Sequence, residues 1–594
     1  MAIIVQKFGG TSVATPEKIL AAARKAIRAQ KENNQVVMVV SAMGHSTDEL
    51  IDLAHQITDR PPAREMDMLL STGEQVSVAL MAMAIHALGS RAVSLTGAQI
   101  GIRTDATHTK ARIKSISTRR MQQLLDAGNI VIAAGFQGID EDLNITTLGR
   151  GGSDTTAVAL AAVLRAQACE IYTDVDGVYT TDPRQLPEAR RVPRISYDEM
   201  LELASLGSGV MHNRSIEFGK KYGVAIHVRN SQSDAPGTMI VAEPESREVA
   251  VCGAALIKDE ARVSVLGVPD VPGTSLDIFS RIAARNVTVD MIVQDVGEGG
   301  KADISFTVPK NELQVTLEAV QDSIRAFGSG TVTHDVNVAK VSVVGLGMAR
   351  QTGVAERMFR TLADHQINIQ MITTSEIKIS ALVSRDHAQA ALRAVHEAFQ
   401  LEKAPPAQAE LESSAASSAD PSDAADVVTR LQGIDMEELF IDDIALDETQ
   451  ARITIKGVPD APGIAARVFE EVAAAGIFVD MIVQSHGGAD RASLSFTVPQ
   501  NRLQLALNVA QQIAGEMACA QVTSCPHVAK LSVSGVGLRS HTGVAIRMFR
   551  ALSEASINLE LISTSEVRVN VIVDGSQGSR ALDCLQTAFA DVLR

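Results

Sequence analysis

The sequence predicts an α/β protein. An N-terminal domain with a mainly parallel sheet covered by helices is followed by four small ferredoxin-like βαββαβ units in two tandem pairs. Two observations support this prediction. Short apolar runs alternate with helical apolar spacing through the first 243 residues, and a long segment of the remaining sequence occurs twice. Alternating strands and helices favour a parallel sheet that is covered on both faces.

The expected strands of the N-terminal domain, which we place at residues 1–243, are short apolar runs. They lie at residues 3–6, 36–41, 92–95, 130–135, 170–172 and 224–228. Between several of these runs, apolar residues recur at the spacing of an amphipathic helix, at residues 16–28, 74–86 and 155–166. Loops at the carboxyl ends of such strands are where parallel α/β sheets bind ligands.

The C-terminal part of the chain is a tandem duplication. The segments that begin at Val263, Val289, Ser305, Thr352 and Thr374 recur 190 residues later, at Ile453, Val479, Ser495, Thr542 and Thr564. A constant offset over this length indicates that a whole unit was duplicated. We therefore expect a first pair of βαββαβ units at residues 247–404 and a second pair at 437–594. The second unit of the first pair lacks its last strand locally, and residues 248–257 are candidates to supply it.

Residues 405–436, between the two copies, are rich in alanine, serine, proline and acidic residues. This composition cannot bury a core, so we expect a flexible acidic linker. Residues 403–448, which include this linker, have a local net charge of −10 out of the chain's formal net charge of −16, and the rest of the chain is only mildly acidic. Aromatic residues make up 3% and tryptophan is missing. We therefore expect neither a nucleic-acid partner nor a membrane partner.

The five cysteines are scattered without a CxxC pair, and the N-terminus has no basic start followed by an apolar core of signal-peptide length. These features favour a soluble cytoplasmic protein with reduced cysteines. The thirteen histidines form no set with the spacing of metal ligands, so we expect no metal site built from the protein's own side chains.

The first polar cluster, Lys7-Phe-Gly-Gly-Thr-Ser12, follows an expected strand and precedes a helix. Gly9 and Gly10 allow the backbone to approach an anion closely. Ser12 supplies hydroxyl and N–H donors, and Lys7 adds a positive charge. This arrangement suits a polyphosphate, although the GxxxxGK[ST] motif is not present. The alternative is an ordinary strand-to-helix turn.

The second cluster, Gly149-Arg-Gly-Gly-Ser-Asp154, again leads into a helix. Arg150 offers a bidentate fork for a carboxylate or phosphate, and the glycines with Ser153 form a second backbone nest. In the alternative interpretation, Arg150 pairs with a surface acid and Asp154 caps the helix.

The third cluster, Thr173-Asp-Val-Asp-Gly-Val-Tyr-Thr-Thr-Asp-Pro-Arg184, follows the expected strand at 170–172. It is dense in hydroxyl and acidic groups but does not fit a calcium loop. Weaker candidates are Ser41 and Thr47 after another strand, and Glu74, whose alternative role is to pair with a helix dipole. Two glycine-rich nests together with Lys7 and Arg150 favour phosphoryl transfer, which depends mainly on positioning and charge neutralisation.

These three motifs resemble the signatures of the aspartate kinase family of the amino-acid kinase fold. The four C-terminal units resemble ACT domains, which bind amino-acid effectors, and a duplicated ACT pair resembles enzymes of cyanobacterial type. The resemblance implies transfer of the γ-phosphoryl group of ATP to the β-carboxylate of L-aspartate, with Mg²⁺ bridging the phosphates. The product would be 4-phospho-L-aspartate, on the route to lysine, threonine, methionine and isoleucine. Because the accepting carboxylate is ionised at pH 7, the reaction needs no general base.

The resemblance also implies roles for individual residues. Lys7 would stabilise the transferred group, and Asp154 would organise Lys7. The aspartate would be surrounded by Ser41, Thr47, Glu74, Arg150 and Ser153. ATP would be held by Lys7, Gly9, Gly10, Ser12, Thr173, Asp174, Tyr179, Asp182 and Arg184. In one departure from the family pattern, Gly209 occupies a position that is a lysine in many members.

For the regulatory half, the resemblance implies effector sites in both copies. The implied residues are Asp270, Gly273, Gln294, Asn368, Asp460, Gly463, Gln484 and Asn558. Lysine, threonine or both are the expected effectors, acting through a coupling free energy of about 1–3 kcal/mol. ACT units typically pair across subunits, so a homodimer or larger homo-oligomer is expected.

Two alternatives stay open from the sequence. A kinase of the same fold could act on glutamate or acetylglutamate instead of aspartate. A catalytically silent amino-acid sensor could use the ACT units alone, although the joint presence of Lys7, Arg150 and Asp154 disfavours it.

Overall fold

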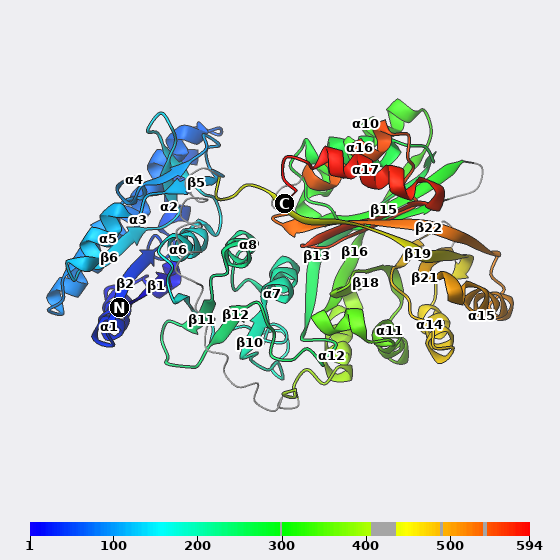
Figure 1. The fold of residues 1–594 in the computed structure, drawn as a ribbon, viewed down its shortest axis with the longest axis horizontal. Coiled ribbons are helices and arrows are strands. Elements are labelled where there is room, and N and C mark those ends of the chain that lie inside the picture. Colours follow the sequence, from blue (N-terminus) through cyan, green and yellow to red (C-terminus); the bar gives the residue numbers. More distant parts are fainter. Residues whose placement is uncertain (297–299, 406–434, 487–490, 539–542, 594) are drawn as a thin grey trace.

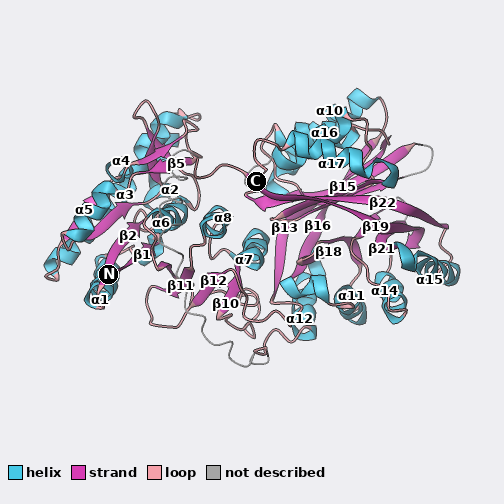
Figure 2. Ribbon diagram, in the orientation of Figure 1, coloured by secondary structure: helices cyan, strands magenta, loops and turns pink. Residues whose placement is uncertain are grey.

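The computed structural model describes residues 1–296, 300–405, 435–486, 491–538 and 543–593. The N-terminal domain lies beside a larger block formed by the C-terminal units (Figure 1). Figure 2 shows helices on both faces of the sheet in each half. The alternating sequence pattern predicted this for the N-terminal domain.

The N-terminal domain is built on an eight-stranded sheet in the order β10-β12-β11-β9-β1-β2-β6-β3. Neighbouring strands are parallel except for the antiparallel pair β11 and β12. The strands are β1 (Ala2–Phe8), β2 (Asn34–Val40), β3 (Ala92–Leu95), β6 (Ile130–Ala134), β9 (Ala168–Thr173), β10 (Arg194–Ser196), β11 (Ile226–Asn230) and β12 (Thr238–Val241). The mainly parallel sheet is therefore confirmed, and β10 and β12 are strands that the sequence pattern did not reveal.

The two faces of this sheet bury alternate residues of the same strand. In β2, Val37 and Val39 share a core with α6, whereas Met38 and Val40 share another core with α1 and α3. This is the two-residue alternation expected for a strand between two helical layers. The helices of this domain are α1 (Pro16–Lys31), α2 (Ser46–Ile57), α3 (Ala63–Ala87), α4 (Gly97–Ile100), α5 (Arg119–Asp126), α6 (Gly152–Val163), α7 (Tyr197–Leu203) and α8 (Asn213–Tyr222).

A separate four-stranded sheet in the order β5-β4-β7-β8 lies over the end of the N-terminal domain. Its strands are β4 (Ile102–Thr104), β5 (Ile113–Ile116), β7 (Gln137–Ile139) and β8 (Ile145–Thr147). We did not predict this sheet, because strands of three or four residues leave almost no periodic signal.

Helix α3 is long and apolar enough to span a membrane by length and composition alone, and it is the one such helix among the described residues. Its most apolar 18-residue window has a mean hydropathy of 1.4 and is 44% buried inside the protein. Core helices of globular domains pass the same test, so this is weak evidence for a membrane span.

The C-terminal block contains one twelve-stranded sheet, with helices on two sides. We number its four units 1 to 4 along the chain. Their helices are α9 (Thr274–Ala283) and α10 (Leu313–Phe327), α11 (Val354–Asp364) and α12 (Ala388–Ala398), α14 (Ile464–Ala474) and α15 (Leu503–Glu516), and α16 (Gly543–Glu554) and α17 (Gly578–Ala588). The strands in sheet order are β14 (Asp290–Val296), β15 (Lys301–Pro309), β13 (Gly253–Pro269), β16 (Thr331–Val344), β18 (Lys378–Ser384), β17 (Ile369–Thr374), β20 (Ile482–His486), β21 (Arg491–Pro499), β19 (Phe440–Pro459), β22 (Gln521–Val536), β24 (Arg568–Asp574) and β23 (Leu561–Thr564).

Long strands join the two units of each pair. The first residues of β13, from Gly253 to Ile257, pair with β16 in unit 2, and the rest of β13 pairs with β15 in unit 1. The prediction that residues 248–257 supply the missing strand of unit 2 is thus confirmed for 253–257. In the second copy, β19 serves units 3 and 4 in the same way.

The four units pair within one chain. Strands β17 and β20 join units 2 and 3, while β14 of unit 1 lies against β23 of unit 4. These four strands enclose an apolar core that contains Val293, Met371, Val483 and Leu561. We expected ACT units to pair across subunits. In this chain the duplicated copy supplies the packing partner: unit 1 packs on unit 4, and unit 2 packs on unit 3. Two such interfaces therefore form inside a single chain.

Most of the expected linker, residues 406–434, lies outside the described residues. Its last residue, Met436, is buried in the core of the N-terminal domain, and its N–H donates to the carbonyl of Lys114. The prediction of a flexible linker up to residue 436 is therefore wrong at that end, because an apolar side chain anchors it there.

Candidate active site and effector pockets

Four parallel strands end side by side at one edge of the N-terminal sheet. Phe8 at the end of β1 is in register with Val40 of β2 and with Tyr172 of β9, and Val40 is in register with Ala134 of β6. The loops that follow these strands carry the glycine-rich and polar motifs. The arrangement therefore collects residues from distant parts of the sequence, as expected for the carboxyl edge of a parallel sheet.

The turn after β1 packs closely on the loop after β2. Gly10 begins a short 3₁₀ helix, and a Cβ at this position would lie 2.8 Å from the carbonyl oxygen of Ala42. Gly44 N–H donates to the carbonyl of Gly10 over 3.1 Å. Ser12 is buried, and its hydroxyl lies 3.5 Å from the carbonyl oxygen of Tyr172. Gly10 is thus required for close backbone approach, whatever ligand the turn binds.

Lys7 points from β1 toward the first turn of α6. Its Nζ lies 2.5 Å from Oδ1 of Asp154, and the two side chains are 12% and 11% exposed. A Cβ on Gly9 would lie 3.3 Å from the same Nζ, so the glycine leaves this ammonium uncovered on the loop side. The structure brings Lys7, Gly9 and Asp154 together, and the N-terminus of α6 adds partial positive charge beside them.

The Arg150 loop, residues 148–151, is held by tight contacts on both sides. Gly149 and Gly151 have φ of 76° and 73°, the left-handed region that favours glycine. A Cβ on Gly149 would lie 2.9 Å from the carbonyl oxygen of Thr109, and one on Gly151 would lie 2.3 Å from Cβ of His212. The loop therefore presents the exposed Arg150 from a rigid backbone at the start of α6.

Glu74 lies on α3 and is 3% exposed. Its Oε1 accepts a hydrogen bond from Ala42 N–H over 3.1 Å, whereas Oε2 is buried without a hydrogen-bond partner among the described residues. Burial raises the pKa of Glu74 to about 7. An unsatisfied buried carboxylate oxygen beside the loop after β2 suits a cationic group of a ligand. Ser41 and Thr47 flank that loop, at the end of β2 and in the first turn of α2.

The remaining expected substrate residue, Ser153, is buried in the first turn of α6. It lies under the loop after β6, where a Cβ on Gly135 would come within 2.6 Å of the serine hydroxyl. Ser153 is thus brought to the same strand edge as Lys7 and Glu74.

The expected nucleotide loop begins at the end of β9. The Thr173 hydroxyl donates to Asp174, and Tyr179 forms a backbone bridge with Arg191. Asp182 and Arg184 form an ion pair with each other at 3.0 Å, and the Arg184 side chain is 84% exposed. Burial opposes the charged form of Asp182, but hydrogen bonds from Arg184 hold its pKa below the usual value. The contacts of these five residues with ATP stay a prediction.

Gly209 follows a π-helical turn, Ala204–Ser208, and has φ of 64°. A lysine at this position would adopt a strained left-handed backbone. The local geometry therefore explains why a glycine stands here.

The expected effector residues gather in two equivalent clusters. Between units 1 and 4, Asn558 donates to Asp270 over 2.8 Å and Gln294 donates to the carbonyl of Leu559 over 2.7 Å. Between units 2 and 3, Asn368 donates to Asp460 over 2.7 Å and Gln484 donates to the carbonyl of Ile369 over 3.0 Å. Gly273 and Gly463 precede α9 and α14 with φ of 101° and 89°. The second cluster lines a cavity of about 10 Å³, room for about one water molecule.

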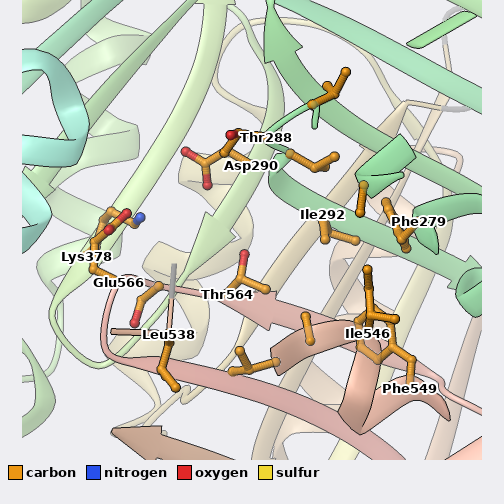
Figure 3. Close-up of a pocket in the computed structure, with 16 residues that line it drawn as sticks. Phe279, Thr288, Asp290, Ile292, Lys378, Leu538, Ile546, Phe549, Thr564 and Glu566 are labelled. Carbon is orange, nitrogen blue, oxygen red and sulfur yellow. The ribbon is translucent and has the colours of Figure 1, made fainter. Parts of the chain in front are cut away.

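Two larger cavities lie between the same units as these clusters. Pocket A, of about 120 Å³, lies between units 1 and 4 and is lined by Phe279, Thr288, Asp290, Lys378, Phe549 and Glu566 among others. Figure 3 shows Lys378 and Glu566 together on one side of pocket A, with Phe279 and Phe549 on the other. Pocket B, of about 290 Å³, lies between units 2 and 3 and includes Glu376, Asp480 and Lys530. Charged groups of both signs beside aromatic rings suit a zwitterion with an aliphatic chain.

Sequence reasoning missed the walls of both pockets. The signal was present, because Thr374-Ser-Glu376 and Thr564-Ser-Glu566 are repeated motifs that we used only to detect the duplication. Also missed was Asp67, fully buried on α3, which accepts hydrogen bonds from His108, Thr109 and Thr147. This cluster holds residues 105–111 against the Arg150 loop.

Comparisons with known proteins agree with this architecture. Residues 2–230 match the amino acid kinase family, and residues 341–399, 453–512 and 531–589 match the ACT domain. An amino acid kinase domain followed by ACT units places the chain in the class of amino acid kinases that carry ACT domains.

Curated relatives narrow the assignment. Aspartokinase from Pseudomonas aeruginosa is 50% identical over 413 residues, which cover 69% of this chain and 100% of that protein. Aspartokinase from Geobacillus stearothermophilus is 50% identical over 402 residues, 68% of this chain and 98% of that protein. The crystal structure of aspartate kinase from Synechocystis is 41% identical and covers 99% of this chain and 98% of that one, with a TM-score of 0.52. The chain belongs to the aspartokinase family, and the resemblance inferred from its motifs is confirmed.

Proposed function

We propose that this protein transfers the γ-phosphoryl group of ATP to the β-carboxylate of L-aspartate and so forms 4-phospho-L-aspartate, the first step toward lysine, threonine, methionine and isoleucine. The observation that carries the proposal is the buried Glu74 Oε2 without a partner, at the same strand edge as Lys7 and Arg150. A dipolar substrate with two carboxylates and one ammonium group matches this set of charges.

The proposed substrate contacts follow from charge and position. Glu74 accepts the α-ammonium group, and Arg150 clamps the α-carboxylate through its guanidinium fork. Ser41, Thr47 and Ser153 provide hydroxyl groups around the substrate. This leaves the β-carboxylate to face the phosphates, where it attacks as an already ionised nucleophile.

The proposed catalytic groups act by placing positive charge. Lys7 neutralises the negative charge of the phosphoryl group as it is transferred, and Asp154 holds Lys7 in position through the 2.5 Å ion pair. The turn formed by Gly9, Gly10 and Ser12 is the segment that we propose to lie against the phosphates. At the end of β9, Thr173 and Asp174 begin the loop that we propose for the rest of the nucleotide, together with Tyr179, Asp182 and Arg184.

Magnesium enters this scheme as part of the MgATP substrate. The described residues contain no group of three or more histidine, cysteine or acidic side chains that would hold a metal ion. We propose that this ion is bound mainly by phosphate and water oxygens.

An ATP-dependent hydroxamate assay tests the proposal. L-Aspartate is expected to yield hydroxamate, while glutamate and acetylglutamate are expected to yield little. Lys7→Ala serves as the inactive comparison. Equal turnover with glutamate would overturn the choice of substrate, and no turnover with any acceptor would leave the amino-acid sensor as the better account.

We further propose that lysine, threonine or both inhibit the enzyme through the ACT units. The two equivalent clusters around Gln294 and Gln484, and pockets A and B, support this proposal because each lies between two ACT units. Titration of activity against each amino acid, alone and combined, tests it. Activity that responds to neither would refute the regulation without refuting the kinase.

We propose that the N-terminal domain spans residues 1–243, that the ACT pairs span 247–404 and 437–594, and that the protein works in the cytoplasm without nucleic-acid or membrane partners. Self-association is proposed through α3, since the ACT interfaces are formed within the chain. Its exposed side chains Met68, Val76, Leu80 and Met83 are 40%, 55%, 39% and 64% exposed. Such a stripe favours a second helix as its cover. Light scattering of Val76→Glu and of the unmodified protein tests this, with a dimer expected for the latter alone.

A further inference from the structure

Three domains of the chain meet at one buried carboxylate. Glu202, at the end of α7 in the N-terminal domain, is fully buried. Its Oε2 lies 2.9 Å from Nζ of Lys378 in unit 2, and its Oε1 accepts a hydrogen bond from Glu566 N–H of unit 4 over 2.9 Å. Burial alone would lower the pKa of Lys378, but the neighbouring carboxylates of Glu202, Asp290 and Glu566 raise it above its usual value. Lys378 is therefore charged and binds the domains together.

The side chain of Glu566 reaches a second point on the N-terminal domain. Its Oε2 accepts a hydrogen bond from Nδ2 of Asn213 over 2.8 Å. Asn213 is the first residue of α8. We name Asn213, Glu202, Lys378 and Glu566 the interdomain cluster.

The residues on either side of Asn213 hold the Arg150 loop. His212 packs closely against Gly151, because a Cβ added to Gly151 would lie only 2.3 Å from Cβ of His212. Arg214 donates to the carbonyl oxygens of Leu148 and Ala111, each over 2.6 Å. Movement of the α8 N-terminus is thus transmitted directly to the backbone that presents Arg150.

The same two residues of units 2 and 4 form part of the wall of pocket A. Both Lys378 and Glu566 line this cavity (Figure 3). An ammonium group that enters pocket A would compete with Asn213 for the carboxylate of Glu566. Occupancy of the pocket and the position of the Arg150 loop therefore depend on the same side chain.

The residues that correspond to Glu566 and Lys378 in the duplication pair with each other and, among the described residues, not with the N-terminal domain. Glu376 and Arg568 correspond in the duplication to Glu566 and Lys378. They form an ion pair with each other, and their side chains are 37% and 32% exposed. Pockets A and B are thus equivalent in sequence, but the charged wall of pocket A is the one in contact with the N-terminal domain.

We propose that Glu566 and Asn213 are positioning residues for aspartate, and that they connect pocket A to the Arg150 loop. Neither residue touches the reacting atoms. They act by fixing the α8 N-terminus and, through it, the guanidinium of Arg150. The inference rests on the proposed function in one respect, the assignment of Arg150 to the substrate carboxylate.

The test uses the full-length protein without effector. Asn213→Asp places two carboxylates face to face and is expected to raise the KM for aspartate about tenfold, since small displacements of a positioning group cost one to two orders of magnitude. The KM for ATP and kcat are expected to stay within about twofold, because these depend on Lys7 and the β9 loop. The double variant Asn213→Asp with Glu566→Gln restores a donor and an acceptor in reverse order, and is expected to return the KM close to its original value.

Matched measurements separate positioning from general damage. Arg568→Gln breaks the equivalent ion pair in the other copy and is expected to leave the KM for aspartate unchanged. Asn213→Ala removes the hydrogen bond without adding a charge, and serves if Asn213→Asp does not fold. Hydrogen exchange of the amides at residues 149–155 can be measured without substrate. It is expected to accelerate in Asn213→Asp and in Asn213→Ala.

An unchanged KM for aspartate, or a failure of the double variant to restore it, overturns the positioning role. Unchanged exchange at residues 149–155 overturns it even if the protein phosphorylates no aspartate. The proposed substrate would be refuted if the protein phosphorylated another acceptor. If the Asn213 variants still showed accelerated exchange at residues 149–155, the proposed connection between pocket A and the Arg150 loop would stand.

Discussion

Lys7 Nζ and Asp154 Oδ1 lie 2.5 Å apart and join the end of β1 to the first turn of α6. The two residues are far apart in sequence and are both nearly buried. A buried ion pair is costly to form unless its geometry is good, and losing one partner leaves the other charge uncompensated. The pair therefore fixes the ammonium group at the position where the phosphates are proposed to bind.

Removing the ammonium group is expected to abolish most of the activity. Lys7→Ala should lower kcat by about 10²–10³-fold, the usual cost of losing a group that neutralises developing charge. Steady-state kinetics of the purified variant measure this. Lys18→Ala is the matched control, since its Nζ donates to the carbonyl of Thr11 in the same turn but is exposed. A Lys7→Ala enzyme with normal kcat would remove Lys7 from the mechanism.

The affinity for aspartate is expected to depend on pH through Glu74. Burial raises the pKa of this carboxyl to about 7, so it is neutral below that pH and cannot pair with the substrate ammonium group. The KM for aspartate should therefore rise as the pH falls from about 8 to about 6.

Glu74→Gln provides the control for this pH effect. It should raise the KM about 10–100-fold, the worth of a hydrogen bond to a charged group, and remove the pH dependence below 8. A pH profile of KM that is the same in both proteins would contradict the assignment of Glu74.

The Arg150 loop is expected not to tolerate a side chain at Gly151. Gly151→Ala combines φ of 73° with a 2.3 Å approach to Cβ of His212. The backbone strain alone costs about 1–2 kcal/mol, and the clash displaces either the loop or α8. The measured result should be a higher KM for aspartate and faster amide exchange in residues 149–155. Gly89→Ala is the control, because its φ is 84° but nothing lies within 4 Å of the added Cβ.

A buried lysine in the first ACT pair is expected to matter more for stability than its counterpart. Lys340 is 1% exposed and contacts both Glu260 at 3.0 Å and Asp290 at 2.5 Å. Lys530 contacts Asp480 at 2.5 Å, and the position equivalent to Glu260 is occupied by Gln450.

Lys340→Met should therefore destabilise the first ACT pair by about 3–5 kcal/mol, because it removes the ammonium partner of the buried Glu260 and of the half-buried Asp290. Lys530→Met should cost less, because it removes the ammonium partner of one half-buried carboxylate, Asp480. Thermal unfolding of the two variants side by side gives the comparison. Equal losses would show that the second carboxylate contributes nothing.

The sequence indicated which segments gather at the edge of the N-terminal sheet, because that signal is local. Lys7 and Asp154 belong to glycine-rich clusters that follow strands, and the structure brings these two residues together. Glu74 lies on a helix, and only the family resemblance pointed to it. The roles of these residues stay predictions. Duplication was equally visible, since copies such as Val289 and Val479 retain a constant spacing.

What escaped prediction depends on non-local packing. The sequences of two similar repeats do not determine which unit of one copy packs on which unit of the other. The pairing of β17 with β20 inside one chain is therefore visible only in the structure. Single polar residues in apolar elements, such as Glu202 and Lys378, give no pattern because each partner lies in a different domain. Met436 was assigned to the linker because the prediction used the composition of the whole segment, and one apolar side chain changes that composition little.

Units 1 and 4, like units 2 and 3, are tethered halves of one polypeptide. Tethering gives each half a high effective concentration of the other, independent of how much protein is present. The amino-acid inhibition proposed above should therefore survive extreme dilution, with inhibition curves that superimpose from nanomolar to micromolar enzyme. An enzyme whose sensing surfaces assemble from separate chains would lose its response as those chains come apart.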